Sequence, residues 1–477
     1  MKLSSRLVSK ISAALLVLAM LLLILPFYPV LILAAAIGTA ASVVLLYMII
    51  DQREALRFSW LLGTSLLVGY AGGTLSTWLS SVSFDDFYFL SKQRPLPLLS
   101  ETLAFVYVCV GLILIAGRLE PEIFESEEKL AYDPRFAALV SLLGLVLIAF
   151  AYAVGDLGFE GVQTDVNSQR VPVLGAAAVL IVSPLAGLFG FMYGRAGTIW
   201  LRLYSAIGGC CAILALVLAG RRQIILGIIM LGLGYSLAGG LRRWSLPRKL
   251  STAALVLGIG SLASAFFFAM RLSAWELGPV SSIGDQLSLA LDFLTSPALE
   301  SRFDAMQYEN LRERTFILGY LADLIEATQR SGWLDGQALL FYLKLSIPSV
   351  LDPSKVDTLA IRQIENFAHP QLGLPVIDQA NTILTDGVTD FGMAGGAIYL
   401  AAIVILLFAS ARLFRKLDKP LTKLIVGLTM IHLALKPEIT LSEYLVPIRD
   451  LIWIVPVLFA CEYLWGTTFS SRLVQPR

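Results

Sequence analysis

Charged residues are scarce in this chain: Asp, Glu, Lys and Arg make up 15% of the 477 residues, whereas 57% are hydrophobic. Soluble globular domains have about 25% charged residues. The composition therefore excludes an ordinary soluble domain and predicts a protein that crosses a membrane several times. The net charge is only +1, and there is no basic arm or cluster of aromatic residues among lysines, so nothing favours nucleic-acid binding.

Cysteine and histidine are also rare, with four and two residues respectively. The cysteines all lie inside apolar runs, and none has metal-ligand spacing to a histidine or to a second cysteine pair; they are Cys109, Cys210, Cys211 and Cys461. We interpret them as small buried hydrophobic residues. We expect neither a cofactor nor a metal site.

Long apolar segments dominate the rest of the chain. About twelve windows of roughly 18 to 22 residues could cross a hydrocarbon core about 30 Å thick. Their approximate limits are 9–26, 30–50, 59–81, 99–117, 136–154, 172–193, 197–219, 223–240, 251–270, 393–411, 421–435 and 446–466. The first follows Lys2, Arg6 and Lys10, but no small-residue cleavage site comes after it, so we expect a retained membrane helix rather than a secretory signal.

The sequence therefore predicts an all-α polytopic membrane protein with nine spans in residues 1–272, a polar insertion at 273–390 and three spans in 391–477. The Lys- and Arg-rich connections alternate with poorer ones, which puts both termini in the cytoplasm and the insertion outside. The insertion holds sixteen acidic and seven basic residues, an acidic excess of nine. Such an excess is consistent with a translocated segment.

The insertion has helical signals of its own. Apolar residues recur at helical spacing in two places and predict amphipathic helices packed on the membrane face or on each other: Ile283, Leu287, Leu291 and Leu294, and Ile317, Tyr320, Leu321, Leu324 and Ile325. Residues 338–345 are mostly apolar but too short to span, and favour an interfacial or re-entrant helix. After Pro348 and Pro353, a stretch with Gly373, Pro375 and Gly387 is typical of a shaped loop.

Four arginines are candidates for binding an anionic substrate. Arg221 and Arg222 stand in a tight turn that the charge pattern places on the outer face, against the trend for basic residues. Guanidinium groups bind phosphate through a planar fork of donors, which suits a lipid-linked pyrophosphate, although snorkelling to ordinary headgroups explains the pair equally well. Arg302 and Arg362 are further candidates, and local ion pairs on a helix face are the alternative.

Four residues are candidates for the chemical step. Asp386 and Asp390 are four apart, so in a helix both carboxylates face the same way, and one of them could deprotonate an acceptor hydroxyl. The alternative for Asp390 is an N-cap of the tenth span, which begins just after it. Asp304 stands at a helix entrance. His369 is expected in a loop, where it is either a base or a bystander.

Ionisable residues also gather around the last two spans and predict an outward-facing polar cluster: His432, Lys436, Glu438, Glu443, Arg449 and Asp450. Ionisable groups at a membrane boundary are candidates for function. Pairing among themselves is the structural alternative.

One stretch carries a resemblance to a known family. Ile347-Pro348 is followed by Pro353-Ser-Lys355 and then by a loop that ends in Asp390-Phe-Gly-Met-Ala-Gly before a hydrophobic span. With the many spans and the large late external loop, this pattern resembles the Wzy-type polymerases of bacterial O-antigen and exopolysaccharide repeat units. The motif covers residues 347–396, about a tenth of the chain, and elsewhere the likeness is one of layout.

The resemblance implies an integral-membrane, GT-C-like glycosyltransferase of the bacterial inner membrane, acting at the periplasmic face on undecaprenyl-pyrophosphate-linked oligosaccharides without a metal. It implies that Arg221, Arg222 and Arg302 hold the pyrophosphates, and it suggests a chain-length regulator and a flippase as partners. Family members often have a Glu and an aromatic residue ahead of Asn-Phe-Gly. This chain has Asp386-Gly-Val-Thr-Asp390-Phe-Gly instead, which leaves the identity of the catalytic base open.

Two other functions fit parts of the pattern. An O-antigen ligase would use the same donor with a lipopolysaccharide core as acceptor, and the motifs hardly separate it from a polymerase. A lipid-linked oligosaccharide flippase or other transporter also has about twelve spans, but transporters bury polar groups along a path at mid-membrane. Here the charges gather at the outer boundary and in one insertion, which favours chemistry at a face.

Overall fold

The structure, a computed structural model, describes residues 2–51, 56–80, 88–89, 92–93, 95–124, 132–153, 172–218, 221–241, 244–278, 283–297, 299, 303, 316–348, 351, 364–375, 380–436 and 438–469. Nearly all of these residues are helical, as predicted. The chain forms two compact units. Unit 1 comprises residues 1–128, 311–416 and 433–456, and unit 2 comprises 129–310, 417–432 and 457–477, so the polar insertion contributes to both.

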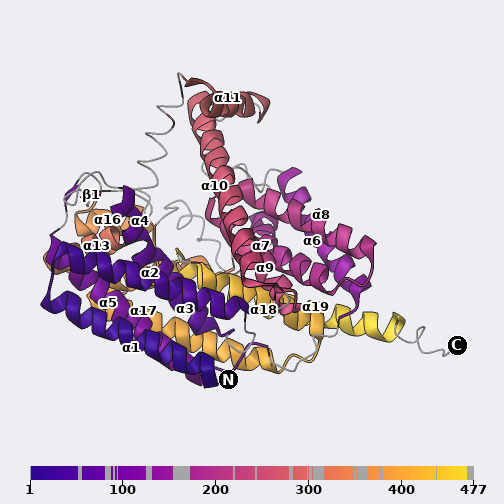
Figure 1. Ribbon diagram of the computed structural model, residues 1–477, viewed down its shortest axis with the longest axis horizontal. Helices are drawn as coiled ribbons and strands as arrows, with labels where there is room; N and C mark the ends of the chain where they lie inside the picture. The colour runs from indigo at the N-terminus through magenta and orange to yellow at the C-terminus, as the bar shows by residue number, and fades with distance from the viewer. Residues whose placement is uncertain are drawn as a thin grey trace. The chain divides into compact units, whose positions relative to one another are not determined.

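Unit 1 is built from the N-terminal helices and the second half of the insertion (Figure 1). Its N-terminal elements are α1 (Lys2–Ile24), α2 (Tyr28–Asp51), α3 (Phe58–Leu67), the π-helix η2 (Val68–Gly72), α4 (Gly73–Ser80), a hairpin of β1 (Tyr88–Phe89) and β2 (Lys92–Gln93), α5 (Leu96–Ala116) and the 3-10 turn η3 (Gly117–Leu119). Its later elements are α13 (Ile317–Ser331), α14 (Gln337–Ser346), α16 (Ile364–Leu372), α17 (Ile383–Arg415) and the start of α19 (Leu441–Phe469).

Apolar helices form the core of unit 1, with a few polar side chains bonded to backbone carbonyls. α1 packs along α5, where Ser12 Oγ donates to the Gly111 carbonyl at 2.8 Å. Tyr107 of α5 donates in the same way to Ala34 of α2 at 2.6 Å. These bonds satisfy hydroxyl groups that would otherwise be costly to bury.

α3 begins at Phe58 because a carboxylate from another helix end satisfies its first N–H groups. Glu120, which follows η3, accepts from Phe58 N at 2.8 Å and from Ser59 N at 2.9 Å. Arg57 donates to the Gly117 carbonyl at 2.6 Å. Burial raises the pKa of Glu120, and its hydrogen bonds to Ser59 and Phe58 oppose that rise.

The amphipathic helix predicted around Ile325 is confirmed as α13. All five residues of its apolar stripe are buried: Ile317, Tyr320, Leu321, Leu324 and Ile325. α13 packs against α17, α5, α16, α4 and η2. This part of the insertion is therefore part of the helical bundle rather than a separate domain.

Unit 2 contains α6 (Pro134–Ala153), α7 (Pro172–Arg195), α8 (Ile199–Leu218), α9 (Arg221–Leu237), α10 (Leu246–Leu277), α11 (Ile283–Thr295), α18 (Pro420–Leu435, all but its last three residues) and the end of α19. α7 and α9 cross at glycines, which lets their backbones touch. A Cβ on Gly190 would lie 2.0 Å from the Leu231 carbonyl oxygen, and one on Gly234 would lie 1.8 Å from that of Gly187. Larger residues would separate the two helices.

The helix predicted from Ile283 is present as α11, at the far end of α10 (Figure 1). Of the predicted stripe, Leu287 and Leu291 are exposed within the protein, as a helix packed on the membrane face allows, and Leu294 packs against a neighbouring cluster. Ala290 and Phe293 are buried in that cluster with Phe268 of α10 and with Phe303. The rings of Phe293 and Phe303 pack together, with their centroids 6.2 Å apart.

Within the described ranges, six helices are long and apolar enough to cross a membrane: 5–24, 28–50, 96–119, 134–153, 383–415 and 441–468. Three shorter apolar helices cover 199–215, 223–237 and 420–435. The helices coincide with the predicted windows, although the third window is divided into α3, η2 and α4. The chain is thus a multi-pass helical membrane protein.

Candidate active site

The segment predicted to hold the catalytic carboxylates forms the first part of α17. Thr382 caps this helix through a reciprocal pair: its hydroxyl accepts from Thr385 N at 3.2 Å, and the Thr385 hydroxyl accepts from Thr382 N at 2.7 Å. The helix therefore begins at Ile383, ten residues before the predicted start of the tenth span. A capping box of this kind satisfies two of the N–H groups exposed at a helix start.

The helical path of α17 breaks sharply after Asp390. Phe391 and Gly392 have non-helical backbone angles, and Gly392 has φ 63° and ψ −158°, a combination that is essentially restricted to glycine. On either side of the break the backbone approaches itself closely. A Cβ on Gly387 would lie 2.3 Å from the Gly395 carbonyl oxygen, so these glycines allow the two parts of α17 to touch.

Asp390 lies before this break and is 0% exposed. Its carboxylate accepts from Ala338 N at 2.9 Å, from Leu339 N at 2.8 Å and from the Tyr399 hydroxyl at 2.5 Å. Asp390 is therefore a helix cap, as the alternative proposed, but of a different helix: it caps α14, and Thr382 caps α17. The residue before α14 is Gly336, which has no side chain, so the N–H groups of the first turn need an acceptor from elsewhere.

Asp386 lies one turn earlier and is 2% exposed. The Tyr342 hydroxyl of α14 donates to its Oδ1 at 2.6 Å, and Leu441 N, the first residue of α19, donates to its Oδ2 at 2.8 Å. Both carboxylates face α14, as their spacing in the sequence predicts. Asp386 thereby joins three helices: α14, α17 and α19.

The opposite end of α14 is held by a cation. Arg449 of α19 donates to the Ser346 carbonyl at 2.5 Å and pairs with Asp450 at 2.7 Å. The Arg449 and Asp450 side chains are 26% and 30% exposed, so this ion pair is accessible to a ligand. Sequence reasoning grouped the two residues in the outer polar cluster but did not count Arg449 among the phosphate-binding arginines.

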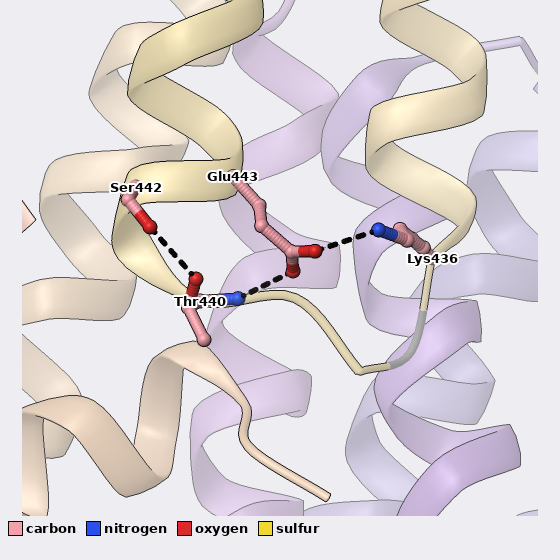
Figure 2. A network of polar contacts seen from close by, with 4 residues as sticks. All are labelled: Lys436, Thr440, Ser442 and Glu443. Atoms are coloured by element: carbon pink, nitrogen blue, oxygen red, sulfur yellow. Dashed lines mark hydrogen bonds and ion pairs between the residues drawn. The ribbon is translucent and has the colours of Figure 1, made fainter. Parts of the chain in front are cut away.

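A second ion pair lies where α18 leads into α19 (Figure 2). Lys436 Nζ and Glu443 Oε1 are 2.9 Å apart. The other oxygen of Glu443 accepts from Thr440 N at 3.1 Å, and the hydroxyls of Thr440 and Ser442 are 3.1 Å apart. The structural alternative for the outer cluster, pairing among its members, is therefore present in two ion pairs, whereas the His432 side chain of α18 is buried.

His369 is in the last turn of α16 rather than in the predicted loop, and it is 2% exposed. Its Nδ1 lies 2.6 Å from the Pro375 carbonyl, to which it donates, and its Nε2 lies 2.9 Å from the Tyr320 hydroxyl. Both ring nitrogens are engaged in joining α16 to α13 and to the segment that follows. This geometry gives His369 a structural role in the described state.

The predicted cationic residues are less completely described. Arg221 and Arg222 are the first two residues of α9, and the structure gives no description of their side chains. Arg302, Asp304 and Arg362 lie outside the described residues. Their roles stay predictions.

The site as described thus consists of two buried carboxylates, Asp386 and Asp390, that hold α14 against α17, and of Arg449 at the other end of α14. Among the described residues, no group of three or more His, Cys, Asp or Glu side chains is arranged to hold a metal ion. The signals that sequence reasoning missed are Tyr342 and Tyr399, whose hydroxyls bind the two carboxylates. Both occur within apolar runs, where a tyrosine looks like an ordinary core residue.

Comparisons of the chain with protein-family models, with curated proteins and with solved structures give no match.

Proposed function

We propose that this protein is a GT-C-like membrane glycosyltransferase that joins undecaprenyl-pyrophosphate-linked oligosaccharide repeat units into O-antigen or exopolysaccharide. The reaction takes place at the periplasmic face of the bacterial inner membrane. The growing glycan leaves its lipid carrier and is bonded through its reducing-end carbon to a hydroxyl at the non-reducing end of an incoming repeat unit. That hydroxyl loses its proton to a base, and the lipid pyrophosphate is the leaving group.

The observation that carries the proposal is how the segment with the polymerase-like motif folds. α14 ends just before Ile347, and the two aspartates of the motif hold it against the helices α17 and α19. Polar and charged groups are thereby concentrated beside long apolar helices. A substrate with a charged sugar pyrophosphate on a polyprenyl tail requires both kinds of surface at one place.

Asp386 is the favoured base. Its Oδ1 already accepts a hydrogen bond from the hydroxyl of Tyr342 at 2.6 Å. A general base must be within about 2.6 to 3.2 Å of the hydroxyl that it deprotonates, so a sugar hydroxyl that displaces Tyr342 would be correctly placed. Arg449 of α19 binds the last turn of α14, the helix that Asp386 also contacts. Its side chain is 26% exposed and supplies a guanidinium for a phosphate oxygen.

The test is polymer formation by the purified protein in lipid vesicles, with undecaprenyl-pyrophosphate-linked repeat units as the only substrate. A ladder of products that differ by one repeat unit is the expected result. Transfer of glycan only to an added lipopolysaccharide core would indicate a ligase instead. Movement of the intact lipid-linked unit across the vesicle membrane without new glycosidic bonds would indicate a transporter, and either result would refute the polymerase.

Variants then test the residues. Asp386→Asn should abolish the ladder, whereas Asp335→Asn, which changes an exposed carboxylate in the adjoining loop, should not. Arg221→Ala and Arg222→Ala should each abolish it if these arginines bind pyrophosphate, and Arg118→Ala, an exposed arginine on the predicted cytoplasmic side, should retain it. Full activity in Asp386→Asn would remove the proposed base. Each variant needs normal membrane insertion and a monodisperse elution profile.

A further inference from the structure

The short helix α14 is held at the level of the membrane-spanning helices. Its first turn is bonded to Asp390 of α17, and its last turn is bonded to Arg449 of α19. Both of these residues lie inside helices that are long and apolar enough to cross a membrane, 383–415 and 441–468. Both residues are in the N-terminal part of their helix, and Asp390 precedes the break in α17, so α14 lies beside the N-terminal parts of these two helices.

One face of α14 is covered by protein, and the opposite face is apolar and open. Ala338, Phe341 and Tyr342 are buried. Leu340 is 60% exposed and Leu343 is 42% exposed, three residues apart and so on one side of the helix. Exposing leucine side chains to water is unfavourable compared with burying them among apolar groups, which makes water an unfavourable neighbour for this face.

The surroundings of this face are those of a helix at a bilayer interface. Trp333 precedes α14, is 57% exposed, and is of the type that gathers at membrane interfaces. Lys344 is exposed beside the leucines, where a lysine can extend its ammonium group to lipid phosphates. Ile452 and Trp453 of α19 are also exposed within the same unit.

We propose that α14 is a lipid-contacting helix: Leu340 and Leu343 lie among the acyl chains of the leaflet, and the Lys344 ammonium binds lipid phosphates at its surface. The helix has 10 residues, about 15 Å in length at 1.5 Å per residue, which is too short to cross the bilayer. Asp386, Asp390 and Arg449 hold it in place from the protein side. This inference depends on membrane embedding and not on the proposed reaction.

The test attaches a nitroxide spin label at single cysteines in the full-length protein in phospholipid nanodiscs, after Cys210, Cys211 and Cys461, which are exposed, are changed to serine. Collision of the label with oxygen, which concentrates in lipid, is compared with collision with a water-soluble nickel chelate. Three reference labels calibrate the result: Ile405→Cys on the exposed face of α17, Asp418→Cys in a polar connection, and Ala338→Cys on the buried face of α14.

Labels at Leu340→Cys and Leu343→Cys should behave like the label at 405, with high oxygen and low nickel collision. Lys344→Glu should raise the nickel collision of the label at 340, because the carboxylate is repelled by lipid phosphates. Nickel collision as high as at 418 would show that the face is in water and overturn the proposal. Low collision with both reagents, as at 338, would show that protein covers the face and would overturn it equally.

Discussion

The carboxylate of Asp390 is expected to control whether α14 stays docked. It has no exposed surface and accepts three hydrogen bonds, two from the first turn of α14 and one from Tyr399. In Asp390→Asn, one of the two oxygens becomes an NH₂ group that faces a donor. The change removes a charge-assisted hydrogen bond, typically about 1.5 to 3 kcal/mol, and leaves a buried N–H without an acceptor, typically about 1 to 3 kcal/mol.

The two contributions together amount to about 2.5 to 6 kcal/mol. At the lower end, a fall of about 3 kcal/mol in the undocking free energy of α14 increases its undocking equilibrium constant about 140-fold. The assay is the rate at which a water-soluble maleimide labels Ala338→Cys, a position with 0% exposure in the docked helix. When opening and closing are fast, this rate is proportional to the population of the open state. As in the spin-label experiment, the protein used has serine in place of the three exposed cysteines.

Two controls separate local undocking from other effects. Asp335→Asn changes an exposed carboxylate in the same loop, and the φ of 52° at this position suits asparagine, so the labelling rate should not change. Cys109 is buried in α5 and should stay unlabelled if only α14 opens. A labelling rate at 338 that is the same in Asp390→Asn and in the parent protein would refute the reasoning.

Two further predictions concern the same unit. Gly392→Ala should lower the free energy of unfolding by about 1 to 3 kcal/mol, because the φ of 63° at this position is unsuited to alanine and the added Cβ would lie 3.2 Å from Trp333. The measurement is the thermal unfolding midpoint in detergent. The control Gly466→Ala, with nothing within 4 Å of the new Cβ, should leave the midpoint unchanged, and equal effects of the two substitutions would contradict this reason. The Lys436–Glu443 pair has side chains 19% and 43% exposed. A double-mutant cycle should give a coupling free energy below about 1 kcal/mol, which decreases in high salt. A larger coupling that salt does not change would contradict the interpretation of this pair as solvent-exposed.

The helices of this protein were largely predictable from the sequence. Long apolar windows mark the spans because only a helix satisfies its backbone within a bilayer, and the apolar stripe from Ile317 to Ile325 marks α13 by its period. α11 shows the limit of such reasoning. Its period identified a helix, but it did not indicate that Ala290 and Phe293 pack with Phe268 and Phe303, because that contact depends on other parts of the chain.

The candidate site was predictable only in part. The spacing of Asp386 and Asp390 indicated a shared face, and both do face α14. Pairing within the outer polar cluster was the structural alternative that the sequence offered, but it did not indicate that Arg449 would pair with Asp450. Arg449 also binds the Ser346 carbonyl, 103 positions away in the sequence. Nothing in the sequence around either residue indicates this contact.

The sequence alone determined that this is a multi-pass helical membrane protein, where its helices lie, and which ionisable residues stand near their ends, because composition and periodicity are local properties of the chain. Only the tertiary structure decided what those ionisable residues bind. Asp390 could cap the helix beside it or one from the insertion. In the structure it caps α14, whose preceding residue Gly336 offers no side chain of its own, while Thr382 caps α17. Such a choice depends on the approach of segments distant in sequence, which neither spacing nor composition encodes.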